Sequence, residues 1–100
     1  MSNNPPGDYS IGSPVLPGLS KLIEECGEVV QVCGKFIGSG GKEDHWDGTN
    51  LRLRLEKELA DLLAAIDFVI EQNGLDRNGV ITPIYENKRS MFDRWHRSQS

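Results

Sequence analysis

Two acidic clusters are the residues of this sequence best suited to chemistry. The first is Glu24, Glu25 and Glu28, and the second is Glu58 and Asp61. Bringing five carboxylates together costs free energy unless cations hold them, because buried charges lose their hydration. Oxygen donors of this kind suit hard divalent cations such as Mg²⁺. The two clusters therefore suggest a divalent metal site.

Helical geometry turns these spacings into directions. At about 100° per residue, Glu24 and Glu28 lie about 40° apart, and Glu25 lies about 60° beyond Glu28. In the second segment Glu58 falls inside an apolar face and Asp61 lies at its edge. That face consists of Leu51, Leu55, Leu59, Leu62, Ala65, Ile66 and Val69. A carboxylate in such a face must be neutralised, paired or bound to metal, because desolvating it uncompensated is costly.

Solvated helix surfaces explain the same acids without a metal. Arg54 lies four residues before Glu58, and Lys57 lies four before Asp61, so both acids suit ordinary ion pairs along a helix. The first cluster also lies far from the centre of its helix's apolar arc. That arc consists of Leu19, Leu22, Ile23, Cys26, Val30, Cys33 and Ile37. Residue chemistry alone leaves both interpretations open.

Capping and turn signals divide the chain into helices. We predict helices from about Leu19 to Lys35 or Ile37, from a cap at Thr49 or Asn50 to Asn73, and from a cap at Thr82 to about His96. The segment Gly38-Ser39-Gly40-Gly41 ends the first, and Asn73–Gly74 is a C-terminal signal. Pro83 suits the first turn of the third helix. The sequence thus predicts an all-α fold.

Composition indicates one small domain with a separate N-terminal arm. Residues 1–18 hold four of the five prolines and one charged side chain, which predicts an extended or disordered arm. Residues 19–97 form the expected helical domain. The chain has no apolar run of transmembrane length and no signal peptide, so cytoplasmic localisation is expected. A net charge of -4 argues against a general nucleic-acid binder and no membrane partner is expected.

Two cysteines share one face of the first helix. Cys26 and Cys33 are seven residues apart, hence about 10 Å along the helix axis, which is too far for a disulfide within that helix. We therefore predict that they are small core residues.

The double acidic motif resembles a known family. Glu24-Glu25-x-x-Glu28, followed after about thirty residues by Glu58-x-x-Asp61, is similar to the MazG-like branch of the all-α nucleoside triphosphate pyrophosphohydrolases. The likeness extends to the segments 17–25, 45–48 and 59–65 and covers roughly residues 17–96. The small single-domain members, several of them from phages, are the most similar.

The resemblance implies a Mg²⁺-dependent hydrolase, with Mn²⁺ as a substitute, that splits a (deoxy)nucleoside triphosphate into the monophosphate and pyrophosphate. It implies Glu25, Glu28, Glu58 and Asp61 as metal ligands and Glu24 as a ligand or the group that orients the attacking water. The expected catalytic residues are Glu24, Glu25 and Lys88, and Glu25 is also an expected metal ligand. Nucleotide-pool adjustment, with a purine substrate such as dGTP, is the implied role.

Lys88 is a charged residue within an aromatic stripe of the third helix. The stripe consists of Ile84, Tyr85, Met91, Phe92 and Trp95. Lys88 either reaches substrate phosphates, extends past the stripe to water, or pairs with Glu58. The family places cations near the end of the fold, so Lys88 and Arg94 are candidate substrate-binding residues, as is Lys21.

The loop residues His45, Trp46 and Asp47 are further candidates for substrate binding. Trp46 suits stacking on a nucleobase, and Asp47 suits accepting hydrogen bonds from a base or sugar. The alternative is that Trp46 packs over the helix ends. His45 and His96 lack partners at metal-ligand spacing, so zinc is not expected.

Broad apolar faces on so short a chain predict self-association. We expect antiparallel helices that form a four-helix-bundle-like core completed by oligomerisation, as a homodimer or homotetramer. The competing functions are a non-catalytic helical oligomerisation module, in which both acidic clusters are solvated, and a related pyrophosphatase acting on dUTP or phosphoribosyl-ATP.

Overall fold

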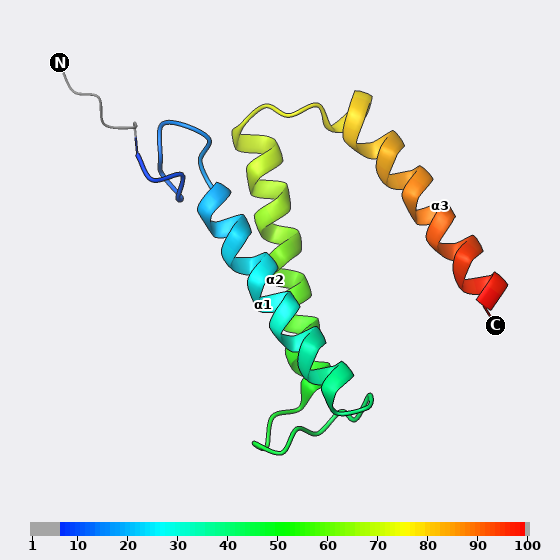
Figure 1. The fold of residues 1–100 in the computed structure, drawn as a ribbon. Coiled ribbons are helices and arrows are strands. Elements are labelled where there is room, and N and C mark those ends of the chain that lie inside the picture. The colour runs from blue at the N-terminus through cyan, green and yellow to red at the C-terminus, as the bar shows by residue number, and fades with distance from the viewer. Residues whose placement is uncertain (1–6, 100) are drawn as a thin grey trace.

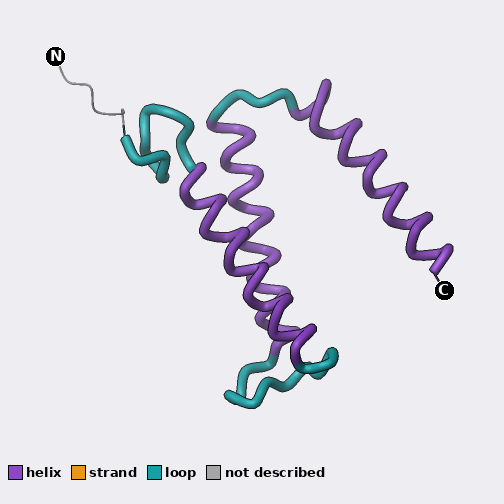
Figure 2. The backbone as a smooth tube through the Cα atoms, in the orientation of Figure 1, coloured by secondary structure: helices purple, strands orange, loops and turns teal. Residues whose placement is uncertain are grey.

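Helices joined by loops make up the computed structural model, which describes residues 7–99 (Figures 1 and 2). The elements are α1 (Leu19–Gly38), α2 (Leu51–Gln72), the π-helical turn η1 (Arg77–Ile81) and α3 (Thr82–Gln99). The described residues form no strands, and their β-type pairing is limited to an isolated bridge between Asp44 and Asn50. The predicted all-α class is confirmed. None of the described helices is long and apolar enough to cross a membrane.

The helices α1 and α2 pack side by side as an antiparallel hairpin (Figure 1). Asn50 is the N-cap of α2, as one of the two predicted caps, and its side chain accepts a hydrogen bond from the Leu53 amide at 2.8 Å. At the other end the chain leaves α2 through Asn73 and Gly74, where Gly74 has a φ of 60° that favours glycine. The predicted bounds of α2 therefore agree with the structure.

The hairpin core lies on a different face of α1 from the one that the apolar arc suggested. Val32 and Leu51 are fully buried, and Glu25 is only 8% exposed. Val32 and Glu25 lie about 80–120° around α1 from the two cysteines. Both Cys26 and Cys33 are exposed free thiols, so the prediction that they are core residues was wrong for the single chain.

Residues 7–18 turn back onto the open end of the hairpin. The Ser20 amide donates to the Tyr9 carbonyl at 3.0 Å, and Asn73 Nδ2 donates to the Pro17 carbonyl at 3.1 Å. Gly18 has a φ of 91°, and a Cβ there would lie 2.7 Å from the Phe68 ring, so both its conformation and its contact require glycine. This part of the predicted arm consists of turns and bends. Residues 1–6 of the arm lie outside the described residues.

The third helix, α3, projects away from the hairpin and packs on η1 (Figures 1 and 2). Arg77 of η1 is held to α2 by an ion pair with Asp67 at 3.0 Å. The radius of gyration is 17.5 Å, whereas a compact domain of this length has about 13 Å. The described part of one chain is thus a two-helix hairpin with a separate third helix, and it contains no four-helix core.

Candidate metal centre

Three acidic side chains from the two predicted clusters meet between α1 and α2. Glu25, Glu58 and Asp61 each offer a carboxylate oxygen, and these oxygens all lie within 4.8 Å of one another. Glu25 comes from α1, and Glu58 and Asp61 are one turn apart on α2, so antiparallel packing brings them together. Glu25 is buried, Glu58 is half-buried and Asp61 is exposed. The cluster therefore runs from the hairpin interior to its surface.

The donor set fits a hard divalent cation. All three groups offer carboxylate oxygen, the ligand that Mg²⁺ and Mn²⁺ prefer. Since Mg²⁺ lies about 2.0–2.1 Å from its ligands, two oxygens on opposite sides of one ion are about 4.2 Å apart. The spread of up to 4.8 Å is slightly wider, so cation binding would require the side chains to draw together by a few tenths of an ångström. Three of the four predicted ligands therefore lie close enough together to hold one cation.

The fourth predicted ligand, Glu28, is engaged elsewhere. Its Oε2 lies 3.8 Å from Arg54 Nη2, and both side chains are partly exposed. The sequence had suggested Arg54 as a partner for Glu58 within α2, but the structure pairs it with Glu28 across the hairpin. Glu28 as a ligand stays a prediction that requires this ion pair to open.

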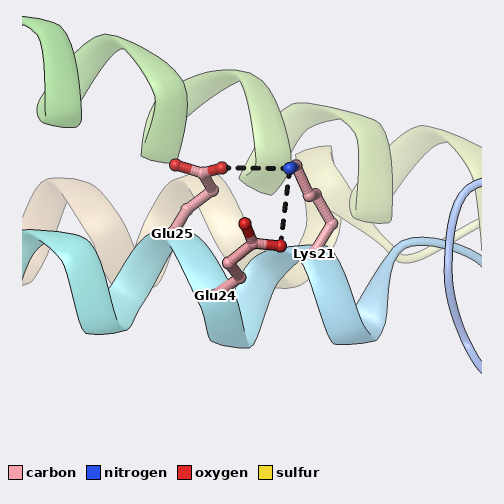
Figure 3. A network of polar contacts seen from close by, with 3 residues as sticks. All are labelled: Lys21, Glu24 and Glu25. Atoms are coloured by element: carbon pink, nitrogen blue, oxygen red, sulfur yellow. Dashed lines mark hydrogen bonds and ion pairs between the residues drawn. The ribbon is translucent and has the colours of Figure 1, made fainter.

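Lys21 joins the two carboxylates of α1 that follow it (Figure 3). Its Nζ lies 3.4 Å from Glu24 Oε2 and 3.5 Å from Glu25 Oε1. The Glu24 carboxylate raises the pKa of Lys21, and Glu25 adds a smaller effect of the same sign. Lys21 therefore keeps a positive charge beside the acidic cluster, where it offsets part of the repulsion among the carboxylates.

A pocket of about 420 Å³ opens beside these charges. It is lined by Ile11, Lys21, Glu25, Asp61, Ala64, Ala65 and Phe68. The pocket thus places one cation and two anions next to an apolar wall, a combination suited to a ligand with a charged end and an apolar ring. Of this wall, the apolar pattern of the sequence had indicated only Ala65. Ala64, Ala65 and Phe68 follow Asp61 at spacings of 3, 4 and 7, which is a helical signal, whereas Ile11 offered none.

The predicted loop residues lie at the other end of the hairpin. From Glu25 to the end of α1 is about 20 Å along the helix axis. Trp46 is 90% exposed, so it does not pack over the helix ends. Hydrogen bonds from Thr49 hold the pKa of Asp47 well below its usual range. His45 Nδ1 lies 3.0 Å from Asp47 Oδ1. One chain does not bring these residues to the acidic cluster.

Lys88 and Arg94 lie on α3, which does not pack against the hairpin in the described residues. Lys88 Nζ is 5.9 Å from the centre of the Phe92 ring and 6.0 Å from that of Trp95, within cation–π range. Its predicted position within an aromatic stripe is therefore observed. Neither cation is brought to the acidic cluster of its own chain.

The comparisons with known proteins found no relative. No family model, curated protein or solved structure matches this chain. The likeness to MazG-like pyrophosphohydrolases therefore rests on the motif residues themselves. What the fold adds is that two motifs about thirty residues apart in the sequence place three carboxylates at one point.

Proposed function

We propose that this chain is a divalent-cation-dependent nucleoside triphosphate pyrophosphohydrolase, which converts a (deoxy)nucleoside triphosphate into the monophosphate and pyrophosphate. One observation carries the proposal. Glu25, Glu58 and Asp61 offer oxygens within 4.8 Å of one another, beside Lys21 and an open pocket. Carboxylates that hold a cation and a lysine that binds phosphate are the groups this reaction needs.

Each residue of the site has a separate proposed role in the reaction. Mg²⁺ held by Glu25, Glu58 and Asp61 would offset negative charge on the phosphates. Lys21 would bind a phosphate oxygen, a role supported by its side chain lining the same pocket as two of these acids. Substrate phosphate would compete with Glu24 for Lys21, and this would free Glu24 to orient the attacking water.

The bond changes are those of an in-line hydrolysis. The water oxygen forms a bond to one phosphorus of the α–β bridge, and the bridging P–O bond breaks. The water proton is lost to a carboxylate or to solvent. Attack at either phosphorus yields the same two products. Because the pocket wall is apolar, with Phe68 and Ile11 on it, the base and sugar have a surface to contact. A purine deoxynucleotide such as dGTP is the proposed substrate.

We also propose that the enzyme is a homodimer or homotetramer. Lys88 and Arg94 on α3, and His45, Trp46 and Asp47 in the loop, lie away from the acidic cluster of their own chain. Any contact they make with the substrate would therefore come from a neighbouring chain. Such an arrangement is also what the proposed four-helix core requires.

A nucleotide panel tests the proposed activity. Pyrophosphate release is measured with each common NTP and dNTP, with dUTP and with phosphoribosyl-ATP, using Mg²⁺, Mn²⁺ or excess chelator. We expect cation-dependent release that is fastest with a purine deoxynucleotide. Preference for dUTP or phosphoribosyl-ATP would reassign the substrate. Absence of release from every compound would contradict the proposed activity and favour the non-catalytic oligomerisation module.

A further inference from the structure

The apolar arc of α1 contains a regular seam that is exposed over most of its length, with only its Leu19 end half-buried beside residues 9–16. The seam consists of Leu19, Ile23, Cys26, Val30, Cys33 and Ile37, at spacings of 4, 3, 4, 3 and 4. This is the heptad repeat by which one helix packs along another, here over about 27 Å. Ile23, Val30 and Ile37 are 73%, 70% and 81% exposed. A seam this regular and this exposed is suited to contact with another helix.

Apolar residues of α2 extend this surface. Leu59, Leu63 and Ile66 follow one another at spacings of 4 and 3 and are all exposed. On each helix the exposed apolar residues lie about 80–160° from the packed face, in the same rotational sense. Because the helices are antiparallel, an equal rotation places both sets on one side of the hairpin. Lys21 and Asp61 are rotated in the opposite sense, so the pocket opens on the other side.

The residues that flank the α1 seam on one side have small, uncharged side chains. Gly27 and Gly34 flank it at heptad spacing, and a Cβ on either would contact nothing within the described part of the chain. Packing inside one chain therefore does not require these glycines, although each costs about 0.5–1 kcal/mol relative to alanine in a helix. Small residues at this spacing let the backbone of a second helix approach closely.

The exposed area matches what a partner would cover. The chain exposes 7582 Å², whereas a compact monomer of 11.1 kDa exposes about 5,700 Å². The excess is roughly 1,900 Å². Obligate homodimers bury about 2,000–5,000 Å² in total, half from each chain. This excess, to which the projecting α3 contributes together with the seam, is in the range that one chain contributes to an obligate interface.

We propose that the α1 seam, together with Leu59, Leu63 and Ile66, is the surface by which a second copy of this chain binds. A two-fold axis brings the same patch of both chains together, and an apolar patch without charge is complementary to itself. The proposal gives a location to the oligomer proposed above. It rests on none of the acidic residues, because covering this side leaves the pocket open.

Measurement of mass in solution tests the surface with a matched pair of variants. Light scattering or sedimentation should give the wild type at least twice 11.1 kDa at micromolar concentration. Val30→Glu places a charge in the seam and should shift the mass toward one chain. Gln31→Glu adds the same charge to an exposed neighbour about 100° further round α1 and should leave the assembly intact. A monomeric wild type, or a Val30→Glu variant that stays assembled, would overturn the proposal.

The native thiols provide a second test that needs no variant. Both cysteines lie on the seam and are exposed in the single chain, so a second copy must cover them. In the native wild type they should react with a thiol reagent at least tenfold more slowly than in denaturant. Reaction at the denatured rate would show an uncovered seam and overturn the proposal. Pyrophosphate release is assayed separately, so failure of this interface and failure of the proposed activity are distinguishable.

Discussion

The two sides of the α1–α2 hairpin differ in the chemistry of the side chains that they present. On one side Glu25 is only 8% exposed and meets two further carboxylates, whereas on the other side Ile37 is 81% exposed. Carboxylates are rarely buried without a partner, and large aliphatic side chains are usually covered. Lys21 is the ion-pair partner of Glu25 at 3.5 Å, and the proposed cation would offset the remaining negative charge of the acidic cluster. On the other side, the proposed second copy would cover the seam.

Removal of one charge from the acidic side should have the largest effect. Glu58→Gln keeps the size of a half-buried side chain and removes its charge. We expect turnover to fall by about 100-fold or more, because a ligand is lost, while the cation-free protein stays as stable or becomes more stable through reduced repulsion. Initial rates of pyrophosphate release and a melting curve in chelator measure the two effects.

Glu71→Gln is the matched control for that variant. It makes the same change in an exposed residue about 20 Å further along α2, so activity and stability should both stay close to wild type. Turnover of Glu58→Gln within twofold of this control would remove the basis for the metal site.

The next largest effect concerns Lys88, which belongs to neither side of its own hairpin. Lys88→Met keeps apolar volume over the Phe92 and Trp95 rings and removes the charge. If Lys88 binds phosphate in a neighbouring chain, kcat/KM should fall about tenfold, equivalent to about 1.4 kcal/mol of transition-state stabilisation. Steady-state kinetics with the preferred nucleotide measure it.

Arg89→Met provides the comparison for Lys88. The Arg89 guanidinium is already paired with Asp93 at 3.4 Å, and this partner raises the pKa of Arg89. Loss of this charge should change kcat/KM by less than twofold. Equal losses in both variants, or a change in stability alone for Lys88→Met, would make Lys88 a structural residue.

Cation binding should stabilise the hairpin through its acidic side. At ten times its dissociation constant, Mg²⁺ contributes about 1.4 kcal/mol, which raises Tm by about 6–11 °C in a domain of this size. The double variant Glu25→Ala with Asp61→Ala should lose most of this rise. Differential scanning fluorimetry with and without millimolar Mg²⁺ measures it, and an unchanged rise in the double variant would place the cation elsewhere.

The smallest expected effect is on the scaffold that both sides share. Asn50→Ala removes the side-chain cap of α2 and should cost about 1 kcal/mol of unfolding free energy. The cap includes no residue of the acidic cluster or of the α1 seam. Turnover measured below Tm and the mass in solution should therefore be unchanged. Urea unfolding, with activity and mass as controls, measures this. A large loss of turnover in the folded variant would mean that the loop also shapes the site.

Local signals predicted the elements, and chain geometry supplied the rest. The Asn50 cap and the Asn73–Gly74 stop are short-range patterns, and the structure follows them. The third helix does begin at Thr82, but Thr82 was wrongly predicted to be a cap, because it has helical φ and ψ and continues directly from η1. The two acidic motifs also predicted where the hairpin would bring carboxylates together, except that Glu28 pairs with Arg54.

Other features depend on contacts that periodicity does not encode. Helical spacing identifies the apolar arc of α1 but not what covers it, so Cys26 and Cys33 were wrongly assigned to the core of the chain. The turn of residues 7–18 onto α2 depends on Gly18 against Phe68, a contact across fifty residues. The separation of α3 from the hairpin likewise left no local signal.

Binding of Mn²⁺ tests the central proposal most directly, because the free aqueous ion has a strong electron paramagnetic resonance signal that is broadened when protein binds it. Titration of the wild type should reveal a site that Mg²⁺ competes for, Glu58→Gln should weaken it at least tenfold, and Glu71→Gln should leave it unchanged. Equal Mn²⁺ affinity in the wild type and Glu58→Gln would contradict a cation site built from Glu25, Glu58 and Asp61.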